Sequence, residues 1–407
     1  MITHLEISGF KSFRHVSLDL GGVNVLIGTN ASGKTNFFDA LRVLQGIGYG
    51  FTIDEIFNGK PKSASGEVWE PIRGKSGNAG FLDWATGRRE EPVQFAVTVK
   101  PSERSEELRY LIALSPMEGK ANEESLYSGD SPVFRSESTE PWDSEGIPVH
   151  VGHDDEPVRN ELYSPAFEAF RPVLRQLLNR PDLLNTDLLK TCSRLLSNIQ
   201  LLDPTPANLR AYTEGRNVSR MGDRGENFAG LVQSILGDQE SAAAYTSWLK
   251  QLTPAELDEV VTLHGALQEP LFALRKGGHD FPAPVLSDGT LRFAAIAAAF
   301  FQPDMPEMIL IEEVENGIHP TRLRLLMELL KSQAARGAPQ VMVTSHSPLV
   351  LAWLNEEDYK TTFFFSKDDE TGASTITPLS KVPRFQELTH KYHAADLFAE
   401  GWLEGAL

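Results

Sequence analysis

Residues 28–35 read Gly-Thr-Asn-Ala-Ser-Gly-Lys-Thr, which matches the pattern G-x-x-x-x-G-K-[ST]. The apolar run 23–27 predicts a buried strand before this segment, and Phe37, Leu41 and Leu44 after it have helical spacing. Between a strand and a helix, the N–H groups of such a turn surround a phosphate chain, Lys34 reaches the β and γ phosphates, and the Thr35 hydroxyl ligates Mg²⁺. An ordinary glycine turn capping a helix needs no lysine followed by a hydroxyl. The sequence therefore predicts an α/β fold with a nucleoside triphosphate site at Gly28, Thr29, Asn30, Ala31, Ser32, Gly33, Lys34, Thr35 and Asn36.

A second apolar strand is predicted at 308–311, and two glutamates follow it directly. A phosphate-binding loop of this type needs an acidic group at the end of another strand, to hold the metal and to orient water. We therefore predict that Glu312 lies toward the Mg²⁺ shell and that Glu313 is the general base for attack on the γ-phosphate. The alternative is a pair of solvated glutamates at a strand end, which is a common arrangement.

Three further segments discriminate between classes of phosphate-loop protein. Residues 286–290 read Leu-Ser-Asp-Gly-Thr and precede an alanine-rich helix predicted at 290–301. Residues 315–320 read Glu-Asn-Gly-Ile-His-Pro and follow the acidic strand, and a helix is predicted at 320–335. The strand predicted at 340–344 is followed by Ser-His-Ser, so His346 lies just beyond its end.

Together with Phe10-Lys-Ser-Phe13, these ordered motifs resemble those of the ABC-type ATPases, in the group that contains RecF, the SMC proteins and the OLD nucleases. The resemblance implies a mixed sheet with flanking helices, with ATP and Mg²⁺ as cofactors. It implies an ATP-dependent homodimer, in which Ser287 and Gly289 of one copy contact the γ-phosphate bound to the other. Ser287 offers a hydroxyl there, and Gly289 lets the backbone approach the anion closely. The resemblance also implies that His346 is a catalytic switch histidine, which senses the γ-phosphate.

Four positions need separate comment. Glu312 stands where the group usually has Asp, so contact with Mg²⁺ is expected to run through water. Asp288 stands where a second glycine is frequent, and a carboxylate near phosphate is unfavourable unless it points away. Gln94 is a candidate for the group's metal-contacting glutamine, with an ordinary surface position as the alternative. His319 is expected at an interface or a helix start rather than in catalysis.

The chain is predicted to have three parts. Residues 1–165 form an N-terminal lobe with the phosphate loop, an irregular excursion over 46–92 and a strongly acidic stretch over 101–165. Residues 166–282 form a helical insertion, with helices near 167–178, 186–199 and 226–236, and residues 283–407 form a C-terminal lobe. The basic residues of the insertion either follow a phosphate backbone or form a solvated face: Arg171, Arg175, Arg180, Lys190, Arg194, Arg216, Arg220 and Arg224.

Composition excludes several classes of protein. The 407 residues carry a net charge of −18, which argues against coating nucleic acid by bulk charge. One cysteine permits neither an internal disulfide nor a cysteine zinc cluster, and His150, His153, Asp154 and Asp155 are predicted in a loop that lacks a scaffold for a metal. The longest apolar run, 293–301, is shorter than the roughly 20 residues of a membrane-spanning helix. Because the N-terminus also lacks a secretion signal, we expect a cytoplasmic protein without a membrane partner.

The leading hypothesis is a Mg²⁺-dependent ATPase whose ATP-driven dimer gates a separately encoded effector, such as a nuclease or a toxin, in bacterial DNA maintenance or phage defence. The effector is expected on another chain because the segment after His346 has no carboxylate cluster resembling the nuclease domain of OLD proteins. One alternative is a RecF-like DNA-repair clamp that closes around duplex DNA. Another is a nucleotide-sensing scaffold that scarcely hydrolyses ATP.

Overall fold

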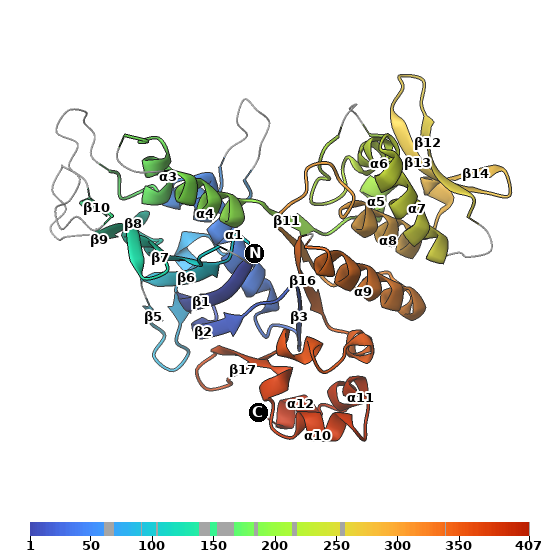
Figure 1. Ribbon diagram of the computed structural model, residues 1–407. Coiled ribbons are helices and arrows are strands. Elements are labelled where there is room, and N and C mark those ends of the chain that lie inside the picture. Colours follow the sequence, from blue (N-terminus) through green and yellow to red (C-terminus); the bar gives the residue numbers. More distant parts are fainter. Residues whose placement is uncertain are drawn as a thin grey trace. The chain divides into compact units, whose positions relative to one another are not determined.

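The computed structural model in Figure 1 describes residues 1–60, 69–90, 92–102, 105–137, 147–152, 167–182, 186–213, 218–252, 257–337 and 339–406. The chain packs into two compact units. Unit 1 consists of residues 1–21, 28–199 and 364–377, and unit 2 of residues 22–27, 200–363 and 378–407. The chain therefore passes between the units several times. The three-part division predicted from the sequence stays a prediction.

Unit 1 is built on an antiparallel sheet of seven strands in the order β10-β9-β8-β7-β6-β1-β2. These strands are β1 (Ile2–Phe10), β2 (Phe13–Asp19), β6 (Val93–Val99), β7 (Leu108–Ser115), β8 (Lys120–Ser128), β9 (Ser131–Glu137) and β10 (Val149–Val151). The unit also holds α1 (Lys34–Tyr49), α2 (Ile53–Asn58), the short helix η1 (Ser76–Asn78), β4 (Phe81–Leu82), β5 (Arg89–Glu90), α3 (Val173–Leu178) and α4 (Asp187–Ser197).

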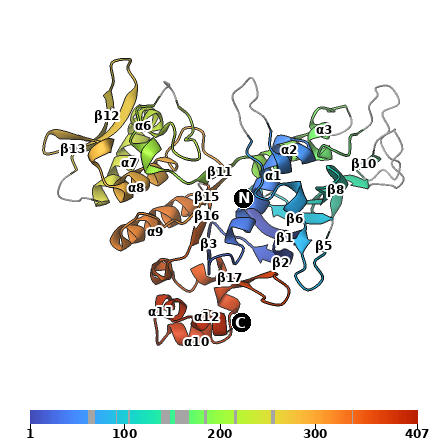
Figure 2. The ribbon, with the colours of Figure 1, turned by 180° about the vertical axis from the view of Figure 1, so that it is seen from behind.

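One face of this sheet is apolar because buried and more exposed residues alternate along its strands. In β6, for example, Phe95 and Val97 are buried, whereas Gln94 between Val93 and Phe95 is exposed. Helices α3 and α4 pack against β8 and β7, and α1 packs against α4 (Figures 1 and 2). The sheet and these helices thus enclose the core of unit 1.

A buried ion pair fixes α1 to the turn between β1 and β2. Lys11 Nζ lies 2.5 Å from Asp39 Oδ2, and the two side chains are 7% and 1% exposed. Burial lowers the pKa of Lys11, although the neighbouring Asp39 carboxylate acts in the opposite direction. The helix that follows the phosphate loop is therefore held by a charge contact remote from the loop in sequence.

Unit 2 contains three adjacent parallel strands, β15 (Met308–Ile311), β16 (Gln340–Ser345) and the unit's part of β3 (Val23–Gly28). Ile311 lies opposite Val343, and Ser345 lies opposite Ile27. All of β15 and β16 is buried, as expected for strands covered on both faces. Strand β11 (Ile199–Leu202) begins at the last residue of the 28–199 segment of unit 1, and β17 (Thr362–Lys367) and β18 (Ser374–Pro378) lie mostly in unit 1.

The rest of unit 2 consists of helices and one small sheet. The helices are α5 (Pro206–Leu209), α6 (Phe228–Leu236), α7 (Gln239–Leu252), α8 (Asp288–Ala298), α9 (Pro320–Ala335), α10 (Phe385–Thr389), α11 (Ala394–Ala399) and α12 (Trp402–Gly405), with short helices η2 (Ala283–Val285), η3 (Pro348–Trp353), η4 (Asp358–Lys360) and η5 (Leu379–Lys381). The small antiparallel sheet comprises β12 (Glu259–His264), β13 (Pro270–Lys276) and β14 (His279–Pro282).

The predicted α/β fold with a mixed sheet and flanking helices is confirmed. The strand at 308–311 and the helix at 320–335 have the predicted bounds. The irregular excursion predicted over 46–92 is wrong in its first part, since α1 continues to Tyr49 and α2 follows. Thr52 and Glu55 form a capping box at the start of α2, and Ile53, Ile56 and Phe57 are buried along it. Among the described residues, no helix combines the length and the apolar character needed to cross a membrane.

Candidate functional site

The loop 28–33 leads from β3 into α1, and two of its positions require glycine. Gly28 has φ 147° and Gly33 has φ 108°, which L side chains rarely adopt. A Cβ on Gly28 would lie 2.3 Å from the carbonyl oxygen of Phe365, and one on Gly33 would lie 2.5 Å from Ser374 Oγ. Both close approaches exclude a larger residue. The local structure therefore explains why glycine occupies these two positions of the motif.

Lys34 is buried at the start of α1, and its ammonium group faces the loop. Nζ donates hydrogen bonds to the carbonyl oxygens of Gly28 at 2.8 Å and Thr29 at 2.7 Å, and to Ser32 Oγ at 3.4 Å. Gly33 is the N-cap residue and has no side chain to bond the first N–H groups of α1. A buried cation beside uncapped helix N–H groups is an arrangement suited to an anion.

The turn after β1 borders the phosphate loop. Asn36 Nδ2 donates to Ser12 Oγ at 2.8 Å, and Ser374 Oγ also lies 2.8 Å from Ser12 Oγ. The backbone N–H of Ser374 donates to the Ser12 carbonyl at 2.7 Å. Sequence reasoning listed Ser12 only as part of a motif, and the structure assigns it a role in supporting the loop.

The acidic pair lies at the end of β15, as predicted. Glu312 is half-buried and Glu313 is exposed. Glu313 has φ 45°, a left-handed conformation that is costly for a residue with a side chain. Its N–H donates to Thr344 Oγ1 at 2.9 Å, and the N–H of Val314 donates to the Thr344 carbonyl at 3.0 Å. The end of β16 thus fixes the acidic turn, and Thr344 is a contributor that the sequence did not reveal.

His346 and the acidic segment are joined by a hydrogen bond. The backbone N–H of His346 donates to Glu315 Oε1 at 2.7 Å, while His346 as a residue is exposed at the end of β16. Glu315 is a further functional candidate that sequence reasoning missed. Its position as the third acid after β15 was the available signal.

The predicted signature segment forms the start of α8. Ser287 is exposed and is the N-cap residue, and its Oγ accepts a hydrogen bond from the N–H of Thr290. Arg322 on α9 donates to Thr290 Oγ1 at 2.9 Å. A Cβ on Gly289 would lie 2.4 Å from the carbonyl oxygen of Gly317. Glycine at 289 is therefore required by packing within this copy, independently of any ligand.

Asp288 in the signature segment forms an ion pair with an arginine. Arg210 Nη2 lies 2.5 Å from Asp288 Oδ1 and also donates to the carbonyl of Leu286 at 3.0 Å. The two charged side chains are 31% and 57% exposed. The expected conflict between Asp288 and a phosphate is thus reduced by a neighbouring cation, which the sequence did not identify.

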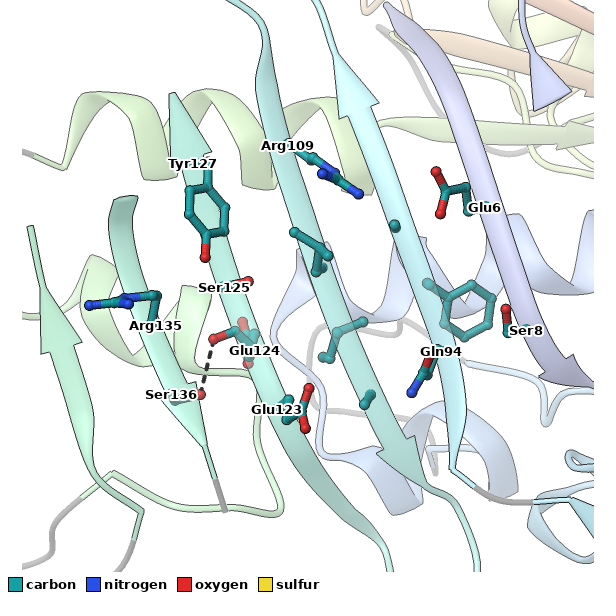
Figure 3. Close-up of a pocket in the computed structure, with 15 residues that line it drawn as sticks. Glu6, Ser8, Gln94, Arg109, Glu123, Glu124, Ser125, Tyr127, Arg135 and Ser136 are labelled. Carbon is teal, nitrogen blue, oxygen red and sulfur yellow. Dashed lines mark hydrogen bonds between the residues drawn. The ribbon is translucent and has the colours of Figure 1, made fainter. Parts of the chain in front are cut away.

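Two secondary expectations are also resolved. His319 is the N-cap residue of α9, so the expected helix start is confirmed. Gln94 is exposed on the open face of the seven-stranded sheet, as its surface alternative predicted. There it lines a hollow of about 390 Å³ beside Ser8 (Figure 3). Charged residues of both signs line the hollow: Glu6, Glu123, Arg109 and Arg135.

The other residues considered as ligands or DNA contacts contribute less. His153, Asp154, Asp155 and Arg216 lie outside the described residues. Among the residues that are described, no cluster of three or more His, Cys, Asp or Glu could hold a metal ion. Several of the predicted basic residues bond within the chain: Arg171 to the Gly50 carbonyl, Arg180 to Asp182 and Lys190 to Asp187. These three are thus already engaged by the protein itself.

A glycine-bordered phosphate loop before a helix, an acidic pair after a parallel strand and a signature serine at a helix N-terminus define the class of ABC-type P-loop ATPases. Residues 23–352 match the family described as "AAA domain, putative AbiEii toxin, Type IV TA system". The chain belongs to this family, because the match covers most of its length.

Individual relatives agree with this class. The DNA replication and repair protein RecF of Nitrosococcus oceani is 47% identical over 51 residues, which is 12% of this chain and 14% of RecF. The chain thus matches about one seventh of the length of this curated relative.

Solved structures show the same fold at low identity. An SMC head bound to the C-winged helix domain of ScpA is 15% identical, with a TM-score of 0.52 over 93% of this chain and 99% of that one. An SMC head with an extended coiled coil, bound to the C-terminal domain of ScpA and derived from Pyrococcus furiosus, is 13% identical, with a TM-score of 0.52 over 96% and 99%. The predicted resemblance to ABC-type ATPases of the RecF and SMC group is confirmed.

Proposed function

We propose that this chain is a Mg²⁺-dependent ATP hydrolase whose ATP-bound homodimer gates a separately encoded effector protein, such as a nuclease or a toxin, in the bacterial cytoplasm. The observation that carries the proposal is the register of the parallel strands in unit 2. Ile27 lies opposite Ser345, and Ile311 lies opposite Val343. The carboxyl ends of adjacent parallel strands meet at one edge of a sheet. The chain therefore leaves that edge into the phosphate loop, the acidic turn and the His346 segment.

The residues have distinct roles in this proposal. Lys34 and the N–H groups of the loop bind the phosphates of ATP. Thr35 and Glu312 supply a hydroxyl and a carboxylate, which are the hard oxygen donors that Mg²⁺ prefers. The ion, when bound, neutralises charge on the phosphates. Glu313 accepts a proton from the attacking water, and its exposed side chain supports that role.

Dimerisation is proposed from the exposed signature segment. Ser287 and Gly289 begin a helix of 11 residues, and Ser287 is exposed. A helix N-terminus beside an exposed serine favours a phosphate of a second copy. The His346 ring would then sense the γ-phosphate. A protein partner is supported by the two SMC heads, each of which is bound to a domain of ScpA.

Light scattering of the Glu313→Gln protein tests the proposal. The substitution keeps the shape of the side chain but removes the base, so bound ATP persists. With ATP and Mg²⁺ we expect the mass to double from 45.0 kDa, and without ATP we expect no doubling. Glu357→Gln, at an exposed position, is the control. An unchanged mass together with no heat of ATP binding in calorimetry would contradict the proposal.

A pull-down with and without ATP tests the effector. We expect a cellular protein to be retained by Glu313→Gln with ATP and lost from a Lys34→Ala variant, which cannot hold the nucleotide. Retention that is the same in both variants would argue against ATP-dependent gating. If no protein and no DNA is retained in either state, gating fails.

The match to RecF favours a second candidate, a clamp that binds duplex DNA. In that case the purified protein with ATP should reduce the mobility of duplex DNA in a gel, and added salt should weaken this shift. Charge reversal at Arg171 and Arg175 should weaken the shift, with Arg175 as the cleaner test because Arg171 also bonds the Gly50 carbonyl. The scaffold alternative predicts instead that Glu313→Gln leaves the already slow turnover almost unchanged.

A further inference from the structure

Arg292 connects the signature helix to the acidic turn within unit 2. It lies on α8, and its side chain is only 8% exposed. Its Nη2 donates to the carbonyl oxygens of Glu312 at 2.9 Å and Glu313 at 3.4 Å. Its Nη1 donates to the Pro204 carbonyl at 3.1 Å and lies 3.2 Å from Asp203 Oδ1. A buried guanidinium thus has backbone carbonyls of the acidic pair as acceptors.

These bonds reach a backbone that needs support. Glu313 has φ 45°, and a left-handed backbone conformation is unfavourable for a non-glycine residue unless the surroundings hold it. Thr344 Oγ1 accepts a hydrogen bond from the N–H of Glu313, and Arg292 donates one to the carbonyl oxygen of Glu313. The residue is therefore held from both sides of its backbone. The direction of its side chain depends on that backbone.

We propose that Arg292 is a positioning residue that sets the acidic turn from the signature helix. This inference rests on the proposed function, in which Glu313 is the base. The same helix begins at Ser287, where the phosphate of the other copy would bind. When Ser287 of one copy binds the phosphate held by the other copy, Arg292 couples this contact to the alignment of Glu313 in the copy that carries Ser287. That Glu313 acts on the ATP bound to its own copy. Arg292 does not itself touch the nucleotide.

An exclusively structural role makes a different prediction. If Arg292 only neutralises Asp203 and fills space, any loss of activity should follow the loss of folded protein. If it positions Glu313, the turnover number should fall while ATP binding stays. Lysine retains the charge but cannot offer the guanidinium's several directed donors to separate carbonyls. Arg292→Lys therefore separates the two roles.

The experiment measures kcat, KM, the Kd for ATP and the melting temperature for four proteins. We expect Arg292→Lys to lower kcat by roughly 10-fold to 100-fold, with KM and Kd changed by less than about 3-fold, because one misdirected catalytic group is enough for such a loss. Thr344→Val removes the hydroxyl from the other side of the turn and should give the same pattern. Arg324→Lys, an exposed arginine on α9, is the matched control and should behave like the parent.

Two outcomes overturn the inference. One is a parental kcat in folded Arg292→Lys, and the other is a loss of kcat that only tracks the folded fraction. If Arg292→Lys proves unfolded, the result for Thr344→Val decides, and a parental kcat there counts against the inference. A parent that neither binds nor hydrolyses ATP would instead sink the proposed function. If Glu313→Gln abolishes turnover but Arg292→Lys and Thr344→Val do not reduce it, this inference is refuted and the proposed function is not.

Discussion

The two units use charged side chains differently. In unit 1 two groups of buried ionisable side chains lie away from the phosphate loop, namely the Lys11–Asp39 pair and Glu124, which is 1% exposed. In unit 2 arginines bond the functional segments themselves: Arg210 holds Asp288, and Arg292 holds the acidic turn. The phosphate loop of unit 1 obtains its shape from glycine conformations, from backbone contacts and from its own Lys34, which bonds two loop carbonyl oxygens. Charge substitutions should therefore act on folding in unit 1 and on function in unit 2.

The largest expected effect is on the Lys11–Asp39 pair. Lys11→Met leaves Asp39 buried without its closest cation, which should lower the free energy of unfolding by about 3–5 kcal/mol. Denaturant unfolding measures this loss. Lys360→Met breaks the exposed pair with Glu357 and should cost less than about 1 kcal/mol. If the two variants are equally stable, the buried pair does not anchor α1 as argued.

Lys34 is the exception that sharpens the comparison, because it is a buried charge of unit 1 that belongs to the loop. Lys34→Ala should lower ATP hydrolysis by roughly 10²-fold to 10³-fold, since a positioned cation at the phosphates is lost. Steady-state phosphate release and calorimetry measure hydrolysis and binding. Lys381→Ala, at an exposed position, is the control. If Lys34→Ala binds ATP like the parent, the loop is not part of the ATP-binding site.

Glu124 predicts a pH dependence of folding in unit 1. Burial raises its pKa from 4.5 to about 7, although bonds from the N–H groups of Leu174 and Val173 and from the Tyr110 hydroxyl favour the charged form. Between these pH values the folded state keeps a proton that the unfolded state releases. Stability should therefore fall as the pH rises from 4.5 to 7, by about 3 kcal/mol at most.

Unfolding at a series of pH values measures that dependence. Glu124→Gln has no carboxyl to titrate, so the free energy of unfolding should vary less across this range than in the parent. Glu118→Gln, at an exposed site, should keep the parental pH dependence. An identical slope in Glu124→Gln and the parent would assign the pH dependence to other groups.

The sequence predicted the motifs of the candidate site and the contacts that support them to different degrees. The phosphate loop was predicted residue by residue, because its chemistry depends on consecutive residues and on a strand and helix that are contiguous with it. The acidic pair, Ser287 and His346 were also predicted from local motifs, and their functional roles stay predictions. Their supports were not: Arg210, Arg292 and Thr344 lie far along the chain from the segments they bond, and only folding brings them together.

The fold shows the same limit. The strands and helices of strong periodicity, such as β15 and α9, were predicted with the observed bounds. Helix α2 was missed because only six residues form it, and its start depends on a capping box rather than on a long apolar pattern. The pairing order of the strands was not predicted either, since register is set by contacts between distant segments.

The smallest expected effect concerns Arg210 and tests the unit 2 side of the comparison. Arg210→Met leaves the Asp288 carboxylate without its cation at the start of the signature helix, where a phosphate of the other copy would bind. Repulsion should weaken ATP-driven dimerisation by roughly tenfold, as expected for a half-exposed charge pair. Stability should change by less than about 1 kcal/mol for the same reason.

The double variant Arg210→Met/Asp288→Asn decides the cause. If repulsion by the free carboxylate weakens the dimer, removal of that charge should restore ATP-driven dimerisation of Glu313→Gln protein, measured by light scattering as a function of protein concentration. If the arginine itself attracts the phosphate, the double variant should stay as weak as Arg210→Met. A large loss of stability in Arg210→Met would show instead that this pair acts on folding, and the proposed difference between the two units would not hold.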